Sequence, residues 1–320
     1  MSYCAPKYQS SSNANVGGSN SCLTLNALRK IASAYNQTYP HKAIKNISSM
    51  NRNQLWKLIH ERLGDICKEN NNETCWIEQD FVSSLGDSEI YGSFKPIKPK
   101  GKHQWLSTAD IHDVMEQYEE KYPDFSFLGP VPINHSELSD RLVDEVNHLD
   151  LREAYKQGIR KIGIVFNLSP WLPHQTNSGS HWVALWIDMN KRIFAYFDSF
   201  GCESKPNQCI PPQVQSLLSR LKSQIPGFKT VVSRNNMQRD NSECGVYAMY
   251  FLVSALEGRD IEGIFNDIKR DEEINKYRNI FFRPSYRELP AVHFPSAMGG
   301  AGSAYHAPAG QRDAACYYPR

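Results

Sequence analysis

Hydrophobic residues recur at helical spacing in two segments near the start of the chain. A repeat of three to four residues places such side chains on one face of a helix. The positions are Leu25, Leu28 and Ile31 in the first segment and Leu55, Ile59, Leu63 and Ile66 in the second. The pattern predicts a helical module over 22–93. Residues 1–21 are rich in Ser, Asn and Gly, lack this periodicity, and are expected to form a disordered tail.

A Pro- and Lys-rich connector, residues 94–102, separates this module from a second pattern. A helix with Ser107 or Thr108 as its N-cap opens the second region. Four apolar runs then predict buried strands: RKIGIVFNLSP, HWVALWIDMN, RIFAYFDSFG and KTVVSRNNMQ. A helix over 211–224 separates the last two strands, and Gln238 is expected where the last strand ends.

The segment CGVYAMYFLVSALEG is apolar on every side, which predicts a central helix that stops near Gly258. Two further helical stretches fill 259–283, and residues 289–320 lose periodicity and predict a flexible tail. The fold class is therefore α+β, with a central helix packed on a mostly antiparallel sheet. A single enzymatic domain is expected over 103–288, with the helical module as an N-terminal addition.

Composition narrows the class of protein without naming a partner. The chain has 40% hydrophobic and 22% charged residues and a net charge of +2, as in an ordinary globular protein. No apolar run approaches the ~20 residues of a membrane span, and the N-terminus lacks an apolar signal core. We therefore expect no membrane partner and a monomer. Residues 22–75 carry eight Lys and Arg against four Asp and Glu, an excess that suits either weak nucleic-acid contact or a solvated helix face.

Eight cysteines are scattered along the chain without the spacing of a zinc site, and no histidine pair completes one. We expect no metal and no cofactor. In a chain of this length without a secretion signal, the cysteines are interpreted as reduced thiols.

One cysteine lies where catalysis would need it. In DNSECGVYAMYF, Cys244 stands between a polar loop and the apolar helix. It can be a small core residue, or it can begin the helix, where the N-terminal dipole favours a thiolate. A nucleophilic cysteine also needs a base and a group that orients the base.

His181 and Asp198 are candidates for these two roles. His181 begins the second predicted strand and Asp198 ends the third, with a four-residue turn at 188–191 between the strands. An antiparallel hairpin therefore brings the two side chains within reach of each other. Gln238 lies six residues before Cys244, where its side-chain amide can donate a hydrogen bond to an oxyanion beside the Cys244 backbone N–H.

These segments carry a family resemblance. GSHWVALWID, YFDSFG and MQRDNSECGVY resemble the His-Trp, Asp-Ser-x-Gly and Gln-x5-Cys-Gly elements of ubiquitin-like-protein (SUMO) proteases and adenovirus-type proteases. The order His, Asp, Cys fits these enzymes, and papain-type enzymes run Cys, His, Asn. The resemblance implies a papain-like core of permuted order. It makes Cys244 the nucleophile, His181 the base and acid, Asp198 the orienter and Gln238 the oxyanion donor.

The segment QWLSTADIHDVM is similar to the Trp-Leu segment that opens the domain in that family. By resemblance, Trp105 and Trp182 form a clamp over a Gly-Gly dipeptide, where only glycine fits between two indoles. They can equally be core aromatics. Ser242-Glu243 stands where SUMO proteases commonly have Ser-Asp. The N-terminal module is more similar to the extensions of proteases from large DNA viruses, including the African swine fever virus type.

Several functions remain open at this point. The leading hypothesis is a thiol endopeptidase that cleaves after Gly-Gly in viral capsid or core precursors during virion maturation, located in the virion and the host cytoplasm. A second is removal of a ubiquitin-like modifier by the same site. A third is a His-acid-Cys acetyltransferase of the bacterial-effector type, and a fourth is a domain that only binds a Gly-Gly tail.

Gly-Gly itself occurs twice in the chain, at Gly17-Gly18 and at Gly299-Gly300. Both pairs lie in segments expected to be flexible, and an apolar residue, Val16 or Met298, precedes each. Extended chain suits a protease cleft, so self-cleavage after Gly18 and Gly300 is one hypothesis. The other is that glycine pairs simply gather in flexible tails.

Overall fold

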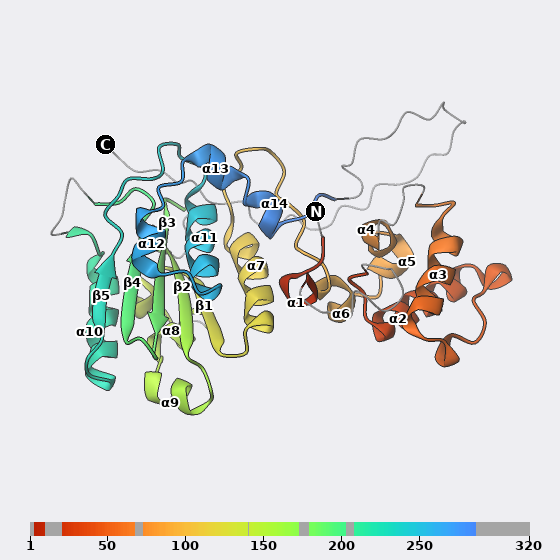
Figure 1. Ribbon diagram of the computed structural model, residues 1–320, viewed down its shortest axis with the longest axis horizontal. Helices are drawn as coiled ribbons and strands as arrows, with labels where there is room; N and C mark the ends of the chain where they lie inside the picture. The colour runs from red at the N-terminus through yellow and green to blue at the C-terminus, as the bar shows by residue number, and fades with distance from the viewer. Residues whose placement is uncertain are drawn as a thin grey trace. The chain divides into compact units, whose positions relative to one another are not determined.

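The computed structural model describes residues 3–9, 21–67, 73–139, 141–172, 179–202 and 208–285. Within these residues the chain forms two compact units (Figure 1). We call the part up to residue 98, with residues 281–285, the N-terminal unit. The part from 99 to 280 is called the catalytic unit, since it holds the candidate site residues.

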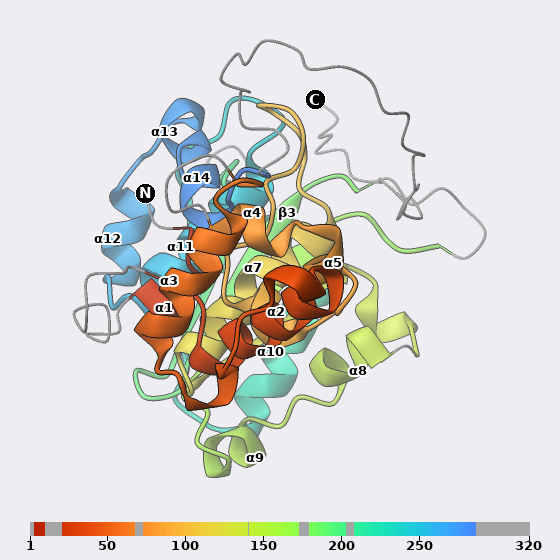
Figure 2. The same cartoon turned by 90° about the vertical axis from the view of Figure 1, so that its right-hand side faces the viewer.

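The N-terminal unit is helical, and α2 packs against α3 and α5 (Figure 2). Its helices are α1 (Pro6–Gln9), α2 (Leu25–Thr38), η2 (Pro40–Lys42), η3 (Ile47–Ser49), α3 (Arg52–Leu63), α4 (Glu73–Ile77), α5 (Asp80–Ser83) and α6 (Ser88–Gly92). Residues 3–9 of the expected tail thus include a short helix.

Sequence explains where the two longer helices of this unit begin. The Thr24 side chain accepts a hydrogen bond from the Ala27 N–H, and Asn51 and Gln54 form a capping box at the start of α3. The apolar positions that predicted the helices face the core, with Leu28, Ile31, Leu55, Ile59 and Leu63 all buried. Ile66 is 37% exposed because α3 ends at Leu63.

The catalytic unit is built on one five-stranded sheet of order β1-β2-β3-β4-β5. The central pairs, β2 with β3 and β3 with β4, are antiparallel, and the outer pairs, β1 with β2 and β4 with β5, are parallel. The strands are β1 (Phe125–Pro132), β2 (Lys161–Asn167), β3 (Trp182–Asp188), β4 (Ile193–Phe197) and β5 (Lys229–Val232).

Helices cover both faces of this sheet. The long helix α11 packs against β3, and α7 packs against β1 and α11. The core on the other face joins the sheet to α8, α9 and α10. The helices are α7 (Thr108–Lys121), η4 (His135–Glu137), α8 (Arg141–Asn147), α9 (Leu151–Lys156), α10 (Pro212–Gln224), α11 (Cys244–Leu256), α12 (Ile261–Asn266), α13 (Asp271–Asn275) and α14 (Arg278–Phe281), the last running to the edge of the unit.

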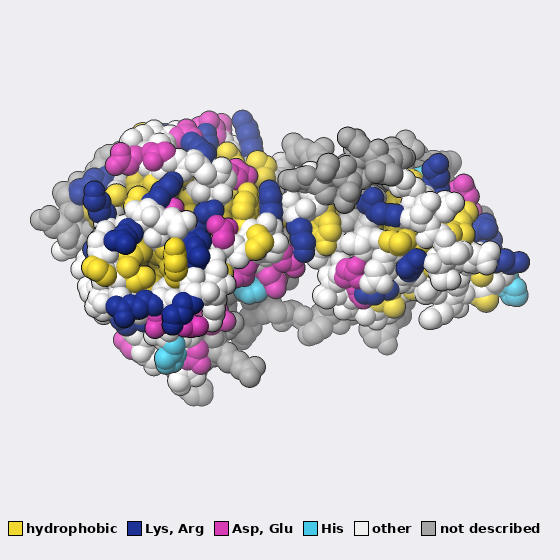
Figure 3. Space-filling model, turned by 60° about the horizontal axis from the view of Figure 1, so that its bottom comes forward, with side chains coloured by type: hydrophobic (Ala, Val, Ile, Leu, Met, Phe, Trp, Pro, Cys, Tyr) yellow, Lys and Arg dark blue, Asp and Glu magenta, His cyan; other side chains and the backbone are white. Residues whose placement is uncertain are grey.

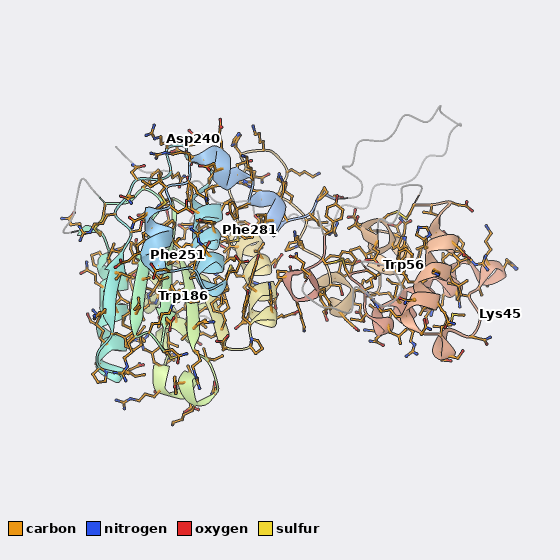
Figure 4. The ribbon with its side chains drawn as sticks, viewed as in Figure 1. Lys45, Trp56, Trp186, Asp240, Phe251 and Phe281 are labelled. Atoms are coloured by element: carbon orange, nitrogen blue, oxygen red, sulfur yellow. A yellow bond between two sulfur atoms is a disulfide. The ribbon has the colours of Figure 1, made fainter. Side chains whose placement is uncertain are left out.

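Strand β3 shows why apolar and polar residues do not alternate along these strands in the sequence. All seven of its residues are buried, because each face of the strand meets a helical layer. On the α11 face, Phe251 stacks on Phe197 with ring centroids 4.9 Å apart, and Trp186 packs on Phe125 (Figure 4). Gly163 lies on this face too, where a Cβ would be 3.3 Å from Leu252.

The α+β class, the central helix and the expected helix over 211–224 are confirmed. Ser107 is the N-cap of α7, with Asp110 completing a capping box. Strand β1 was not predicted, since its Gly129-Pro130 pair interrupts a strand pattern. The fourth strand ends at Val232, so the expectation that Gln238 ends it is wrong. Three short helices, rather than two, fill the region after α11.

The interpretation of the cysteines as reduced thiols is also wrong for the structure. Disulfides join Cys4 to Cys22, Cys67 to Cys75 and Cys202 to Cys209. Folding brings the Cα atoms of these pairs to between 5.1 and 5.9 Å, a proximity that sequence spacing did not indicate. Among the described residues, no helix is long and apolar enough to cross a membrane.

Candidate active site

The β3-β4 hairpin brings His181 and Asp198 together at one end of the sheet. His181 directly precedes β3 and Asp198 directly follows β4, and Ala184 lies opposite Phe197 in the register of the two strands. His181 Nε2 lies 2.7 Å from Asp198 Oδ1. This leaves Nδ1 as the ring nitrogen able to exchange a proton with a substrate or a nucleophile.

The surroundings of this pair fix its orientation. The Phe200 N–H donates to Asp198 Oδ1 at 2.9 Å, and the Phe200 ring lies 4.6 Å from the His181 ring. The Ser233 hydroxyl donates to the Asp198 carbonyl oxygen. His181 is 1% exposed. A carboxylate that accepts hydrogen bonds at one oxygen can hold the imidazole in one tautomer and orientation.

Cys244 is the first residue of α11 and is 1% exposed. The first N–H groups of a helix have no partner within the helix, and its dipole is positive at that end, so this position stabilises a thiolate. The Cys244 sulfur is disulfide-bonded in this structure. A nucleophilic role of this sulfur would require the thiol that reduction releases.

Gln238 is fully buried in the connection between β5 and α11. Its side-chain Oε1 accepts a hydrogen bond of 2.6 Å from the Ser199 hydroxyl, and its backbone N–H donates to the Ser199 carbonyl oxygen. Its Nε2 donates to the Asp240 carbonyl oxygen. Asp240 lies in the loop that leads to α11 (Figure 4). An amide nitrogen carries two hydrogens, so one more hydrogen bond to an oxyanion is within its capacity.

Gly201 allows the hairpin and this connection to meet. Its φ is +64°, and a Cβ at this position would lie 2.3 Å from the Arg234 carbonyl oxygen and 2.6 Å from that of Asn235. The neighbours are backbone atoms and cannot rotate away. The glycine of the YFDSFG segment is therefore required by the close approach of the connection that carries Gln238.

Trp182 connects the start of β3 to the segment that contains Trp105, next to the first turn of α11. Its indole Nε1 donates to the Leu106 carbonyl oxygen at 3.0 Å, and Leu106 packs where a Cβ on Gly245 would lie 3.2 Å away. The segment that contains Trp105 thus lies against the first turn of α11. Trp182 is 3% exposed and Trp105 is half-buried. The structure places both tryptophan segments beside the N-terminal end of α11.

A buried ion pair underlies the same helix start. Glu243 precedes Cys244 and is 1% exposed, and its Oε2 accepts from Arg278 Nε at 2.9 Å. The second carboxylate oxygen accepts from Asn275 Nδ2 at 2.9 Å, and Arg278 also donates to the Ser242 carbonyl oxygen. Arg278 is fully buried. The Ser242 carbonyl group and the Glu243 carboxylate, which directly precede Cys244, are therefore held by side chains of α13 and α14.

The roles of Ser199, Phe200, Gly201 and the Glu243–Arg278 pair were not inferred from sequence. The first three lie within the YFDSFG segment, so their position beside Asp198 was a usable signal. The ion pair joins residues 35 positions apart and gave no such signal. In the described part of the chain, no group of three His, Cys, Asp or Glu side chains could hold a metal ion.

Comparison with known proteins gives relatives over nearly the whole chain. A protein of Acanthamoeba polyphaga mimivirus named as a thiol protease is 30% identical over 302 residues, which cover 88% of this chain and 94% of the relative. A SUMO-1 cysteine protease of African swine fever virus is 23% identical over 284 residues, which cover 81% of this chain and 99% of the relative.

The fold has a solved counterpart. A crystal structure of an African swine fever virus protease matches with a TM-score of 0.59 and 19% identity, covering 88% of this chain and 96% of that chain. This likeness concerns the fold alone. Residues 98–296 also match the family model described as YopJ Serine/Threonine acetyltransferase.

Proposed function

The chain belongs to the superfamily of SUMO and adenovirus-type cysteine proteases, with viral thiol proteases among its relatives, and from this premise we propose that it cleaves after Gly-Gly in viral precursor proteins. It is a cysteine-type peptidase. The proposal is supported above all by one observation: the 2.7 Å contact of His181 with Asp198 occurs at the sheet end where α11 begins with Cys244.

In the proposed reaction, His181 takes the proton of the reduced Cys244 thiol, and the thiolate attacks the carbonyl carbon of the scissile bond. The carbonyl π electrons move to the oxygen, and the Cys244 N–H and Gln238 Nε2 donate hydrogen bonds to the resulting oxyanion. As the tetrahedral intermediate collapses, the C–N bond breaks and the imidazolium gives its proton to the leaving amine.

The thioester formed in this way is then hydrolysed. His181 removes a proton from water, the hydroxide adds to the thioester carbonyl, and the C–S bond breaks to release the carboxylate product. Asp198 keeps the same imidazole orientation in both halves, since its hydrogen bond is to Nε2. No metal or cofactor is used.

The Trp105 and Trp182 segments support the proposed specificity. The Trp182 indole is held by its hydrogen bond to the Leu106 carbonyl oxygen, and Leu106 packs on Gly245 at the helix start. In the proposal, the Trp105 and Trp182 indoles form a narrow slot at this end of the helix. Glycine has no Cβ to clash in such a slot, so a Gly-Gly dipeptide before the scissile bond is the substrate that we propose.

The test is cleavage of matched peptides by the full-length protein in a reducing buffer. A peptide with Ala-Gly-Gly before the scissile bond should be cleaved, and the same peptide with Ala-Ala-Ala should be cleaved at least about 100-fold more slowly. Cys244→Ser should abolish cleavage. The control is the double variant Cys67→Ser/Cys75→Ser, which removes a disulfide of the N-terminal unit and should retain activity.

The same protein preparation can be tested for two other activities, deconjugation and acetyl transfer. A ubiquitin-like modifier joined through its terminal Gly-Gly to a fluorophore reports deconjugation, and release of coenzyme A from acetyl-coenzyme A reports acetyl transfer. The family match over 98–296 is the observation that favours the latter. Cleavage of the modifier but not of the peptides would show that the substrate is a modifier conjugate and not a viral precursor. Acetyl transfer without peptide cleavage would overturn the proposal.

The remaining parts of the proposal concern location and processing. We place the protein in the virion and the host cytoplasm, as a monomer, with the N-terminal unit serving targeting or full activity. Weak nucleic-acid contact by this unit is a further prediction. The face shown in Figure 3 carries acidic as well as basic side chains, which suits weak contact only. The sites after Gly18 and Gly300 lie outside the described residues. Intact-mass measurement of active and Cys244→Ala protein tests self-cleavage there.

A further inference from the structure

A pocket of about 520 Å³ opens beside Gln238 in the catalytic unit. Three segments form its walls: the turn after β4, the connection before α11, and the segment between α12 and α13. The lining residues are Phe200, Asn235, Asn236, Gln238, Arg239, Ile268 and Arg270. Its size is that of a site for a side chain or a short stretch of peptide.

The pocket shares its inner wall with the candidate active site. Phe200 lines it, packs against the His181 ring and donates its N–H to Asp198. Gln238, the proposed oxyanion donor, lines it as well. A group bound here would therefore lie next to the reacting carbonyl.

The strand order places the pocket toward the edge of the sheet opposite the Trp105 segment, with Trp182 on the central strand between them. Helix α7, which follows Trp105, packs against β1 at one edge of the sheet. Phe200 follows β4, and Asn235 to Arg239 follow β5 at the other edge. If Trp105 and Trp182 hold the residues before the scissile bond, as the proposed function requires, the pocket lies on the side of the residues after it.

Charge indicates what the pocket would bind. Two arginines, Arg239 and Arg270, line it, and among the residues that the structure describes no Asp or Glu does. Arg270 Nη1 donates to the Asn236 and Met237 carbonyl oxygens at 3.0 and 3.2 Å, which fixes its position. The neighbouring Asp271 carboxylate accepts from the backbone N–H groups of Arg239 and Asp240 and so partly offsets the positive charge.

Ile268 adds an apolar surface to this wall and is 44% exposed. A guanidinium matches a carboxylate in charge and in planar hydrogen-bond geometry, and an exposed aliphatic side chain suits the methylene groups of a glutamate. We propose that this pocket is a subsite for an acidic residue, Glu or Asp, that follows the scissile bond. The inference rests on the proposed function.

The kinetic test uses Gly-Gly peptides that differ only in one residue after the scissile bond. Wild-type protein should cleave the Glu peptide about three- to ten-fold faster, as kcat/KM, than the Gln peptide, and the Lys peptide should be slowest. Arg239→Glu should invert the order of Glu and Lys. Arg234→Glu is the matched control, an exposed arginine of the same connection that does not line the pocket, and it should keep the wild-type order.

A binding measurement separates the two proposals. Fluorescence anisotropy with Cys244→Ala and labelled peptides should show tighter binding of the Glu peptide than of the Gln peptide, and Arg239→Glu should remove this difference. If wild-type protein cleaves no peptide but the difference in binding persists, the proposed Gly-Gly substrate is wrong and the subsite for an acidic residue stands. Cleavage and binding that are both indifferent to Glu, Gln and Lys would overturn the subsite.

Discussion

The candidate site has two halves that are held in different ways. The hairpin half contains the proposed base His181 with Asp198, and the nucleophile half contains the proposed nucleophile Cys244 with Gln238. His181 and Asp198 flank a hairpin whose strands pair directly, and the 16 residues between them are the two strands and their turn. Gln238 and Cys244 belong to a loop and a helix start that little regular structure fixes. The Ser199 hydroxyl holds Gln238 instead, and Asn275 and Arg278 hold Glu243, the residue before Cys244.

The difference teaches where catalytic geometry is vulnerable. Backbone pairing tolerates the loss of one side chain, so a change in the hairpin half should remove chemistry and leave the fold. The nucleophile half depends on buried polar side chains, whose loss leaves unpaired groups in the core. A change there should affect stability and turnover together.

The largest expected effect comes from the hairpin half. His181→Ala removes the proposed base and should lower kcat by about 10⁴-fold or more, and Asp198→Ala should lower it less, because only the orientation of the base is lost. Circular dichroism should show that both variants remain folded. Unfolding of either variant would contradict the view that the hairpin holds itself.

The nucleophile half should respond in the opposite way. Arg278→Leu leaves the Glu243 carboxylate buried without its ion-pair partner, which should reduce the free energy of unfolding by about 3–5 kcal/mol. A carboxylate beside Cys244 that has lost this guanidinium should also raise the pKa of the thiol, which the pH dependence of its alkylation rate would measure.

Two controls accompany this prediction. The double variant Glu243→Leu/Arg278→Leu should recover much of the lost stability. Lys156→Ala breaks an exposed pair with Glu153 and should cost no more than about 1 kcal/mol. Equal losses in Arg278→Leu and Lys156→Ala would show that the buried pair does not support the helix start.

Gly201 joins the two halves, so Gly201→Ala should disturb both. The added Cβ would clash with the Arg234 carbonyl oxygen, and the residue would keep a positive φ. We expect a loss of about 1–3 kcal/mol in stability and a lower kcat. Gly158→Ala is the matched control, because Gly158 has a φ of +95° with nothing within 4 Å of a Cβ. It should affect stability less and leave kcat unchanged.

Ser199→Ala tests the link between the halves more finely. Loss of the hydroxyl frees the Gln238 amide to rotate, which should lower kcat about five- to ten-fold with KM unchanged. Gln238→Ala should lower kcat by roughly 10- to 1,000-fold. If Ser199 acts through Gln238, the double variant should be no slower than Gln238→Ala alone. Additive losses would give Ser199 a separate role.

The smallest effect concerns a buried histidine outside the site. Burial, with the nearby Arg220 charge, lowers the pKa of His135, and a hydrogen bond to Asn147 opposes the shift. Because the folded pKa is below the unfolded one, the stability from neutral His135 is complete above about pH 6.5 and is lost as the pH falls below it. Between pH 7.5 and 5.5, the urea midpoint should fall less in His135→Gln than in wild type.

The sequence by itself determined the elements that depend on local pattern. The apolar runs predicted β2, β3 and β4, and the all-apolar segment predicted α11, because hydrophobic burial and helix capping act over a few residues. Those elements and one short turn were enough to predict that His181 and Asp198 meet. Their catalytic roles, with those of Cys244 and Gln238, remain the proposal that the variants above test.

Only the tertiary structure decided the features that join distant residues. Strand β1 pairs in parallel with β2 despite its Gly129-Pro130 interruption, and Arg278 reaches Glu243 across 35 residues. The disulfides and the pocket beside Gln238 arise in the same way. Such contacts depend on how packed layers bring segments together, which short-range periodicity does not encode. The physical reason is that burial specifies which face of an element turns inward, whereas the partner on that face is set by the packing of the whole chain.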